Sequence, residues 1–285
     1  MHHAPNIPDP GGSVFAETLG QAPGRGRLAG RKLIVVGAGQ RKTPPGEDVP
    51  VGNGRAAALL FAREGASVAC IDRSQDAVQG TVEQIIQAGG SAFAELADVR
   101  DAAAIAPLVA RCAERLGGLD GLLLNVGISK GLPLGQLTAE AWDDDFAVNL
   151  RSHMLFSQAA LALMAPGSAI VLVSSLAALR NTGRNPAYEA SKAAQVSLAR
   201  AIAVAGEAQA IRCNAVLPGL MDTPMGRDAT RRRPNRALAV PFGRQGTGWE
   251  VAYACLYLLS HEASYVNATT LLVDGGLAAG AARAV

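Results

Sequence analysis

A tyrosine and a lysine stand four residues apart in the segment Tyr188-Glu-Ala-Ser-Lys192. Residues four apart lie on one face of a helix, so a helix here would place the Lys192 ammonium beside the Tyr188 phenol. A fixed cation favours the phenolate and lowers the pKa of a tyrosine from about 10 toward neutrality. The pair therefore predicts a general base for proton transfer. A surface tyrosine and lysine one turn apart would give the same pattern.

Two further polar residues stand where chemistry is plausible. Ser175 follows the strand-like run 169–173, and Asn149 lies in the segment Phe146-Ala-Val-Asn-Leu150. Taken alone, Ser175 could cap a turn at the end of a strand. Asn149 could be a residue of a helix interior whose amide is satisfied by a neighbouring carbonyl.

Together these segments resemble the short-chain dehydrogenase/reductase family over residues 28–277. The family pairs Tyr-x-x-x-Lys with a serine thirteen residues upstream, which is the separation between Ser175 and Tyr188. The resemblance implies a catalytic tetrad of Asn149, Ser175, Tyr188 and Lys192, in which Asn149 holds a water in the proton relay to the lysine.

Short apolar runs alternate with amphipathic segments from residue 31 onward. We expect strands at 32–36, 67–71, 92–97, 121–125, 169–173, 211–216 and 270–273, and helices at 55–64, 75–88, 102–116, 138–164, 186–205 and 249–260. Continuous Val/Ile/Leu strands alternating with helices predict an α/β protein, a doubly wound Rossmann fold with a seven-stranded parallel sheet flanked by helices on both faces. Residues 28–285 are expected to form one domain, and residues 1–27, rich in Pro, Gly and His, a flexible N-terminal arm.

Composition narrows the class of protein. The net charge of +2 over 285 residues gives no basic field of the kind that nucleic-acid binding needs. The four cysteines are widely spaced in apolar surroundings, which favours buried free thiols in a reducing compartment over disulfides or metal ligation. The longest apolar stretches are shorter than a bilayer span, and the N-terminus lacks a signal-peptide pattern. We therefore expect a cytoplasmic protein with no membrane partner and no metal.

Glycines flank the junction between the first strand and the first helix. Gly37 and Gly39 follow the strand, and Gly52, Asn53 and Gly54 precede the helix. Glycines let the backbone approach a pyrophosphate, and the helix start offers unpaired N–H groups and the positive end of its dipole. The resembled family has these glycines in one compact motif, whereas here eleven extra residues separate them.

The inserted segment 40–51 carries three prolines and almost no large apolar side chain, so we expect an exposed loop beside the pyrophosphate. One hypothesis is a flap whose Arg41 and Lys42 fold toward the phosphates while Glu47 and Asp48 stay in solvent. The other is a tolerated insertion with no cofactor contact, because long loops cost little closure entropy.

An acid ends the second strand. Asp72 stands where a carboxylate accepts hydrogen bonds from the adenosine ribose and repels a 2′-phosphate, which favours NAD over NADP. Its neighbour Arg73 is either a solvated turn cation or a partner for that 2′-phosphate, so NADP remains the alternative.

The resemblance implies further cofactor contacts in chain order. Asp98-Val99 resembles a pair that contacts the adenine, Asn125 and Gly127 match part of an Asn-Asn-Ala-Gly motif, and the segment from Pro218 and Gly219 to Thr223 resembles one that orients the nicotinamide carboxamide. Tyr188 and Lys192 are implied to contact the cofactor as well.

We therefore expect an NAD(H)-dependent oxidoreductase that interconverts a secondary alcohol and a ketone. An NADP(H)-dependent carbonyl or 3-oxoacyl thioester reductase would use the same tetrad. A non-enzymatic dinucleotide-binding regulator would need no tetrad, and a nucleotide-sugar epimerase or dehydratase would need a larger C-terminal part.

Two features bear on substrate and assembly. The cluster Arg227, Arg231, Arg232, Arg233 and Arg236 could select a carboxylate or phosphate, although such runs are commonly solvated. Apolar surface on the helices near 142–163, after Tyr188 and at 255–259 exceeds what one sheet face can bury, which predicts a homotetramer or, as an alternative, a dimer.

Overall fold

The computed structural model describes residues 12–41 and 50–280. Seven strands form one parallel sheet in the order β3-β2-β1-β4-β5-β6-β9. Their bounds are β1 Lys32–Val36, β2 Ser67–Asp72, β3 Ser91–Leu96, β4 Gly121–Leu124, β5 Ala169–Val173, β6 Arg212–Pro218 and β9 Thr270–Val273. The predicted seven-stranded doubly wound sheet is confirmed.

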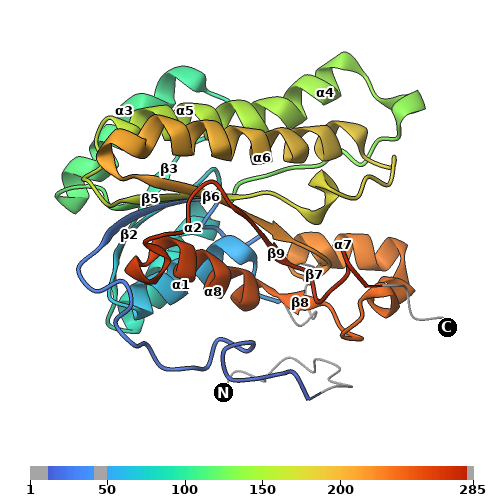
Figure 1. Ribbon diagram of the computed structural model, residues 1–285, viewed down its shortest axis with the longest axis horizontal. Helices are drawn as coiled ribbons and strands as arrows, with labels where there is room; N and C mark the ends of the chain where they lie inside the picture. The colour runs from blue at the N-terminus through green and yellow to red at the C-terminus, as the bar shows by residue number, and fades with distance from the viewer. Residues whose placement is uncertain (1–11, 42–49, 281–285) are drawn as a thin grey trace.

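Helices cover both faces of the sheet (Figure 1). On one face lie α1 Asn53–Arg63, α2 Gln75–Gln87 and α8 Gly248–Leu259; on the other lie α3 Ala102–Leu116, α4 Ala139–Phe146, α5 Ser152–Leu161 and α6 Pro186–Gly206. Two apolar cores follow, one under each layer, and β1, β4 and β5 contribute side chains to both. Double-sided burial is the reason that these strands read as unbroken apolar runs.

The chain reverses its winding direction between β1 and β4, which are hydrogen-bonded neighbours with Val36 opposite Leu124. Strands β2 and β3 extend the sheet on one side of this pair, and β5, β6 and β9 extend it on the other. In such sheets ligands bind in the crevice beyond the carboxyl ends of the strands at the reversal. The topology therefore places the site beyond Val36 and Leu124.

The helix predicted at 138–164 is interrupted. A π-helical turn over Ala147–Arg151 separates α4 from α5, and α5 ends at Leu161. The Ser152 hydroxyl donates to the Val148 carbonyl at 2.6 Å, so a side chain competes with the helical backbone at this turn. Asn149 lies within the widened turn, consistent with the frequent use of such turns at functional sites.

The segment after β6 has structure that the sequence analysis left unassigned. Helix α7 spans Pro224–Arg232 and is followed by the 3₁₀ helix η5 at Pro234–Ala239. Two short strands, β7 at Met221–Asp222 and β8 at Gly246–Thr247, pair in parallel. This pairing brings the start and the end of the segment together. Thr247 and Glu250 then form a capping box that begins α8.

Residues 12–27 differ from the expected flexible arm, while residues 1–11 lie outside the described part of the chain. The Thr18 carbonyl accepts the Thr247 hydroxyl at 2.8 Å, and the buried Glu64 carboxylate accepts the backbone N–H groups of Arg25 and Arg27 at 2.9 Å each. Ala22 is buried against the domain. Hydrogen bonds to the starts and ends of helices hold this segment even though it has little apolar content.

All four cysteines are free and buried, as expected. Burial raises the pKa of the Cys70, Cys112 and Cys255 thiols to about 12. Within the described ranges, no helix combines the length and hydrophobicity that a bilayer span requires.

Replacing Arg244 by methionine should lower the free energy of unfolding by roughly 3 kcal/mol, the cost of breaking a largely buried ion pair. Arg244 is buried, contacts Glu250 at 2.7 Å and donates to the Ser13 hydroxyl and carbonyl. The exposed Arg25–Glu17 pair is the control, since R25A should change stability by less than about 0.5 kcal/mol. Chemical denaturation measures the free energy of unfolding of both variants. Equal losses in the two variants would show that the buried Arg244–Glu250 pair contributes no more to stability than the exposed pair.

Candidate active site

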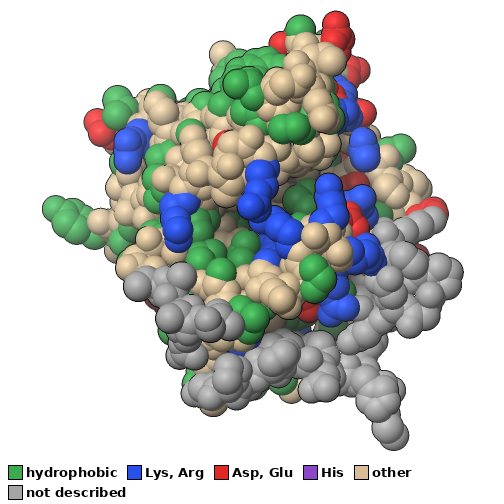
Figure 2. All heavy atoms as spheres, turned by 90° about the vertical axis from the view of Figure 1, so that its right-hand side faces the viewer, with side chains coloured by type: hydrophobic (Ala, Val, Ile, Leu, Met, Phe, Trp, Pro, Cys, Tyr) green, Lys and Arg blue, Asp and Glu red, His purple; other side chains and the backbone are tan. Residues whose placement is uncertain are grey.

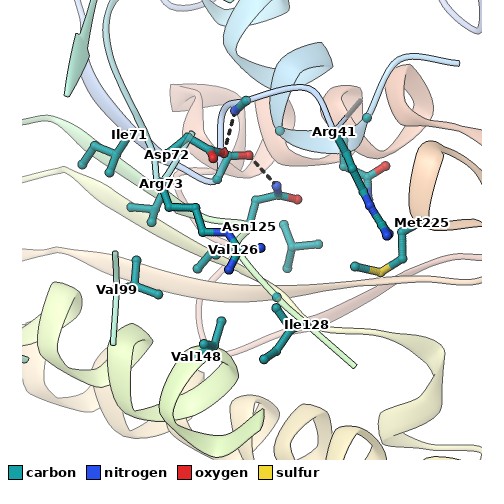
Figure 3. A pocket seen from close by; sticks show the side chains of 18 of the residues that line it. Arg41, Ile71, Asp72, Arg73, Val99, Asn125, Val126, Ile128, Val148 and Met225 are labelled. Carbon is teal, nitrogen blue, oxygen red and sulfur yellow. Dashed lines mark hydrogen bonds between the residues drawn. The ribbon is translucent and has the colours of Figure 1, made fainter. Parts of the chain in front are cut away.

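A cavity of about 420 Å³ opens beyond the carboxyl ends of β1, β4 and β5. One end lies at Asp72, the last residue of β2 (Figure 3). The other end lies at Tyr188 and Lys192 on α6. Figure 2 views this end of the molecule and shows Lys and Arg side chains gathered around a hollow. The sheet reversal thus brings together residues that are more than a hundred positions apart in the chain.

The glycines form a tight cradle at the start of α1. A Cβ on Gly54 would lie 1.8 Å from the Gly37 carbonyl oxygen, and Gly37 itself has φ +83°. No side chain caps the start of α1, and the buried Asn53 Oδ1 has no hydrogen-bond partner. Free backbone donors and close backbone approach fit the diphosphate of a dinucleotide.

The ends of the insertion are tied together, although residues 42–49, with Lys42, Glu47 and Asp48, lie outside the described residues. The Gln40 amide donates to the Pro50 carbonyl at 2.9 Å and accepts the Gly52 N–H at 3.0 Å. Arg41 lines the cavity, but its guanidinium pairs with Asp228 of α7 at 2.7 Å.

Asp72 faces the glycine turn. Its carboxylate accepts the N–H of Gly39 at 2.9 Å and that of Ser74 at 3.1 Å, and a Cβ on Gly39 would lie 2.7 Å from it. Arg73 is exposed and lines the same part of the cavity (Figure 3). A carboxylate and a guanidinium therefore stand side by side at this end of the cavity.

The middle of the cavity is lined by residues after β3 and β4. Asp98 pairs with Arg100 at 3.1 Å, and Val99 is buried. Asn125 donates its amide to the Gly37 carbonyl at 3.0 Å, so it braces the glycine cradle. A Cβ on Gly127 would lie 3.3 Å from the Lys192 Nζ, and the missing side chain leaves room for that ammonium.

The segment after β6 contributes less than expected. Thr223 lines the cavity and caps α7 by accepting the Gly226 N–H at 3.1 Å. Pro218 and Gly219 do not line it; Pro218 ends β6, and Gly219 donates to the Val273 carbonyl of β9 at 2.9 Å. These two residues therefore lie at the carboxyl end of β6, where that strand pairs with β9.

The arginine cluster is partly neutralised within its own segment. Arg227 pairs with Asp222 at 2.6 Å, and Arg231 pairs with Asp228 at 2.7 Å. Arg236 is partly buried and donates to the Gly226 carbonyl at 3.3 Å. Arg232 lies near the loop after β4, with its Nη1 3.6 Å from the Cβ position of Gly131.

Tyr188 and Lys192 lie at the far end of the cavity, and Ser175 is hydrogen-bonded to Tyr188 behind them. Burial raises the pKa of Tyr188, a hydrogen bond with Ser175 opposes this rise, and the Asp145 charge adds to it. Lys192 Nζ lies 5.7 Å from the centre of the Tyr188 ring and donates to the Val173 carbonyl at 3.0 Å. Burial lowers the pKa of Lys192 to about 7. The pKa of Tyr188 is therefore raised and not lowered as expected, because burial outweighs the Ser175 hydrogen bond.

Asn149 braces the loop after β4 from the π-helical turn. Its amide accepts the Ile128 N–H at 2.8 Å and donates to the Ile128 carbonyl at 2.9 Å and to the Ser191 hydroxyl at 3.0 Å. Its backbone carbonyl accepts the side-chain amide of Gln195. Neither Asn149 nor Ser175 lines the cavity itself, whereas the neighbouring Ser174 does.

Asp145, His153 and Gln195 are three polar residues of this site to which the sequence patterns assign no role. All three are buried, and the Asp145 Oδ1 has no hydrogen-bond partner. Burial raises the pKa of Asp145 to about 6. A polar residue three positions after Lys192 on an otherwise apolar helix face was the available signal for Gln195.

Known proteins match this architecture over most of the chain. Residues 51–278 match the family model described as enoyl-(acyl carrier protein) reductase. The 3-oxoacyl-[acyl-carrier-protein] reductase FabG of Thermotoga maritima is 32% identical over 254 residues, covering 88% of this chain and 99% of the relative.

Solved structures agree in fold. A short-chain dehydrogenase/reductase from Burkholderia xenovorans superposes with a TM-score of 0.82 at 36% identity, covering 90% of this chain and 99% of that one. A short-chain dehydrogenase from Burkholderia cenocepacia in complex with NADP gives 0.82 at 31% identity, with coverages of 89% and 100%. The chain belongs to the short-chain dehydrogenase/reductase family and is a nicotinamide-dependent oxidoreductase that interconverts alcohols and ketones.

Proposed function

We propose that this protein is an NAD(H)-dependent dehydrogenase of a secondary alcohol, with Asn149, Ser175, Tyr188 and Lys192 as its catalytic tetrad. The observation that carries the proposal is the continuous cavity from the glycine cradle and Asp72 to Tyr188 and Lys192. A dinucleotide held at one end would reach the proton-transfer residues at the other.

The chain's residues divide the chemistry of alcohol oxidation. The Tyr188 phenolate takes the hydroxyl proton, and the Ser175 hydroxyl donates to the substrate oxygen as the carbonyl forms. Lys192 stabilises the phenolate, and Asn149 holds the loop after β4 against α6. When bound, the nicotinamide ring accepts the hydride in this direction and supplies it in the other.

The residues of the cradle would hold the cofactor by contacts of distinct kinds. Backbone donors at Asn53 and Gly54 suit the diphosphate, and Gly52 lets the backbone approach it closely. Asp72 suits the hydroxyls of the adenosine ribose. Asp98, Val99, Asn125 and Gly127 line the path between the two ends. Pro218 and Gly219 would act on the nicotinamide only through the position that they give Thr223.

NADP-dependent reduction is the second candidate. An NADP-bound structural neighbour and the similarity to a 3-oxoacyl-[acyl-carrier-protein] reductase support a carbonyl or thioester reductase. Arg73 and Arg41 in the cavity lining would be the cations that receive a 2′-phosphate. A non-enzymatic regulator is disfavoured because it would need no grouped Tyr188, Ser175 and Lys192.

A cytoplasmic location and a homotetramer complete the proposal. Four buried free thiols suit a reducing compartment.

A groove of about 620 Å³ between α4–α5 and α6 includes Met154, Leu198 and Ala201 in its walls. The α8 residues 255, 256, 258 and 259 are buried within the chain, so they give no support to the tetramer and correct that part of the expectation.

Replacing Tyr188 by phenylalanine should lower kcat at least 10²-fold, because the phenol is the acid-base group, while NADH binding persists. A panel of secondary alcohols, polyols, hydroxy acids and ketones with both cofactors identifies the substrate for the assay. The fully exposed Tyr265 is the matched control, and Y265F should leave turnover unchanged. Turnover of Y188F within threefold of wild type would refute the assignment.

Replacing Asp72 by asparagine should lower the NAD-to-NADP ratio of kcat/KM by about 10- to 100-fold, through loss of a charged hydrogen-bond acceptor. The wild-type ratio should favour NAD. E83Q removes the same charge from an exposed position on α2 and should leave the ratio unchanged. A wild-type preference for NADP would show that Arg73 or Arg41 dominates.

Light scattering at micromolar concentration should give the mass of a tetramer, and A201R in the groove of α6 should reduce it, because a charge would be buried between helices. A110R on the exposed face of α3 is the control and should keep the wild-type mass. A monomeric wild type would contradict the proposed assembly.

A further inference from the structure

Lys192 is held from its inner side by a glutamine one helical turn further along α6. Its Nζ donates to the Gln195 Oε1 at 3.2 Å as well as to the Val173 carbonyl at 3.0 Å. Lys192 is 3% exposed and Gln195 is fully buried. Two of the three N–H bonds of the ammonium are thus committed inside the protein, and one remains for the cavity that Lys192 lines.

The amide nitrogen of Gln195 is fixed by two acceptors. It donates to the Asn149 backbone carbonyl and to the His153 Nδ1 at 2.8 Å. The other ring nitrogen of His153 lies 3.1 Å from the Val126 carbonyl, so it carries the proton and Nδ1 is the acceptor. These contacts leave the glutamine oxygen free to face only Lys192.

His153 is suited to this role because it stays neutral. Burial lowers the pKa of His153 to about 3, and the Lys192 charge acts in the same direction. A neutral imidazole with Nε2 protonated keeps Nδ1 as an acceptor across the physiological range. The network therefore links β4, the π-helical turn, α5 and α6 through groups whose donors and acceptors are matched.

The backbone carbonyl of Asn149, the residue to which the family resemblance assigns a relay water, accepts the Gln195 amide with one of its two lone pairs. Buried amide and imidazole groups cost desolvation, and an apolar pair would fill the same space at no such cost. The hydrogen bond from Lys192 to Gln195 indicates that these polar groups hold the ammonium in place as well as fill space.

We propose that Gln195, oriented by His153, is a positioning residue that fixes the Lys192 ammonium beside Tyr188. The proposal rests on the role given to Lys192 in the proposed function. Gln195 touches neither substrate nor cofactor in this assignment and acts only through the lysine.

The test uses the single variant Q195M and the double variant H153L/Q195M in the full-length protein. Methionine keeps the length of glutamine without its polar atoms, and the double variant removes both partners of the buried Gln195–His153 contact, which restores matched polarity between them. We expect both variants to lose thermal stability, because each leaves the Asn149 carbonyl without its amide donor, and the double variant also leaves the Val126 carbonyl without its imidazole donor. In both variants kcat should fall about 10- to 100-fold, the effect of one lost hydrogen bond to a charged group, while KM for the substrate stays within twofold.

A second measurement does not depend on turnover. The chain has four lysines, so the ¹³Cε resonance of Lys192 can be assigned by comparison with K192M and its titration followed. Loss of the Gln195 acceptor disfavours the charged form and should lower the pKa of Lys192 below that of the wild type. The titratable groups near Lys192 and Tyr188 are His153, Tyr188 and Asp145. Q195M keeps all three groups, whereas the double variant lacks His153.

The outcomes separate the two proposals. A double variant with kcat within threefold of wild type, or an unchanged Lys192 titration in Q195M, would show that Gln195 only packs and would overturn the inference. If wild type turns over no alcohol or ketone, the proposed function fails, and the Lys192 titration still decides whether Gln195 positions the lysine.

Discussion

Burial of the Lys192 ammonium is the constraint around which the site is built. An unpaired charge in the interior is costly, so every element around Lys192 offers either an acceptor or space. Strand β5 offers the Val173 carbonyl, α6 offers Gln195, and the turn after β4 offers a glycine, Gly127, whose missing side chain makes room. The sheet topology matters to function because it brings the carboxyl ends of β4 and β5 and the interior of α6 to one point.

The opposite end of the cavity obeys a backbone constraint. Gly54 and Gly37 approach so closely that any side chain on Gly54 would collide with a carbonyl, and Asn125 ties that carbonyl to β4. The insertion leaves this arrangement intact because Gln40 bonds both to Pro50 and to Gly52 and so closes the base of the loop. Since closure entropy grows slowly with length, an insertion pinned at its base is compatible with a preserved cradle.

The sequence predicted what depends on regular patterns. The seven strands, the glycine cradle and the grouping of Tyr188, Ser175 and Lys192 follow from apolar runs and fixed spacings. The break between α4 and α5 could not be read this way, because it depends on one Ser152 hydroxyl competing for a helical carbonyl. The packed segment 12–27 was missed for a related reason: its hydrogen bonds go to the distant residues Glu64 and Thr247.

The buried ionisable groups of the site fall into two kinds. Desolvation lowers the pKa of His153 to about 3, so the imidazole stays neutral and its Nδ1 remains an acceptor. Burial also raises the pKa of Asp145 to about 6 and lowers the pKa of Lys192 to about 7. A small change in the surroundings of either group can therefore change its charge near neutral pH. Groups poised in this way are typical of proton-transfer sites, and Tyr188 is coupled electrostatically to one of them, Asp145. A rigid neutral histidine behind a poised lysine lets the charge of that lysine respond to what enters the cavity while its position stays fixed.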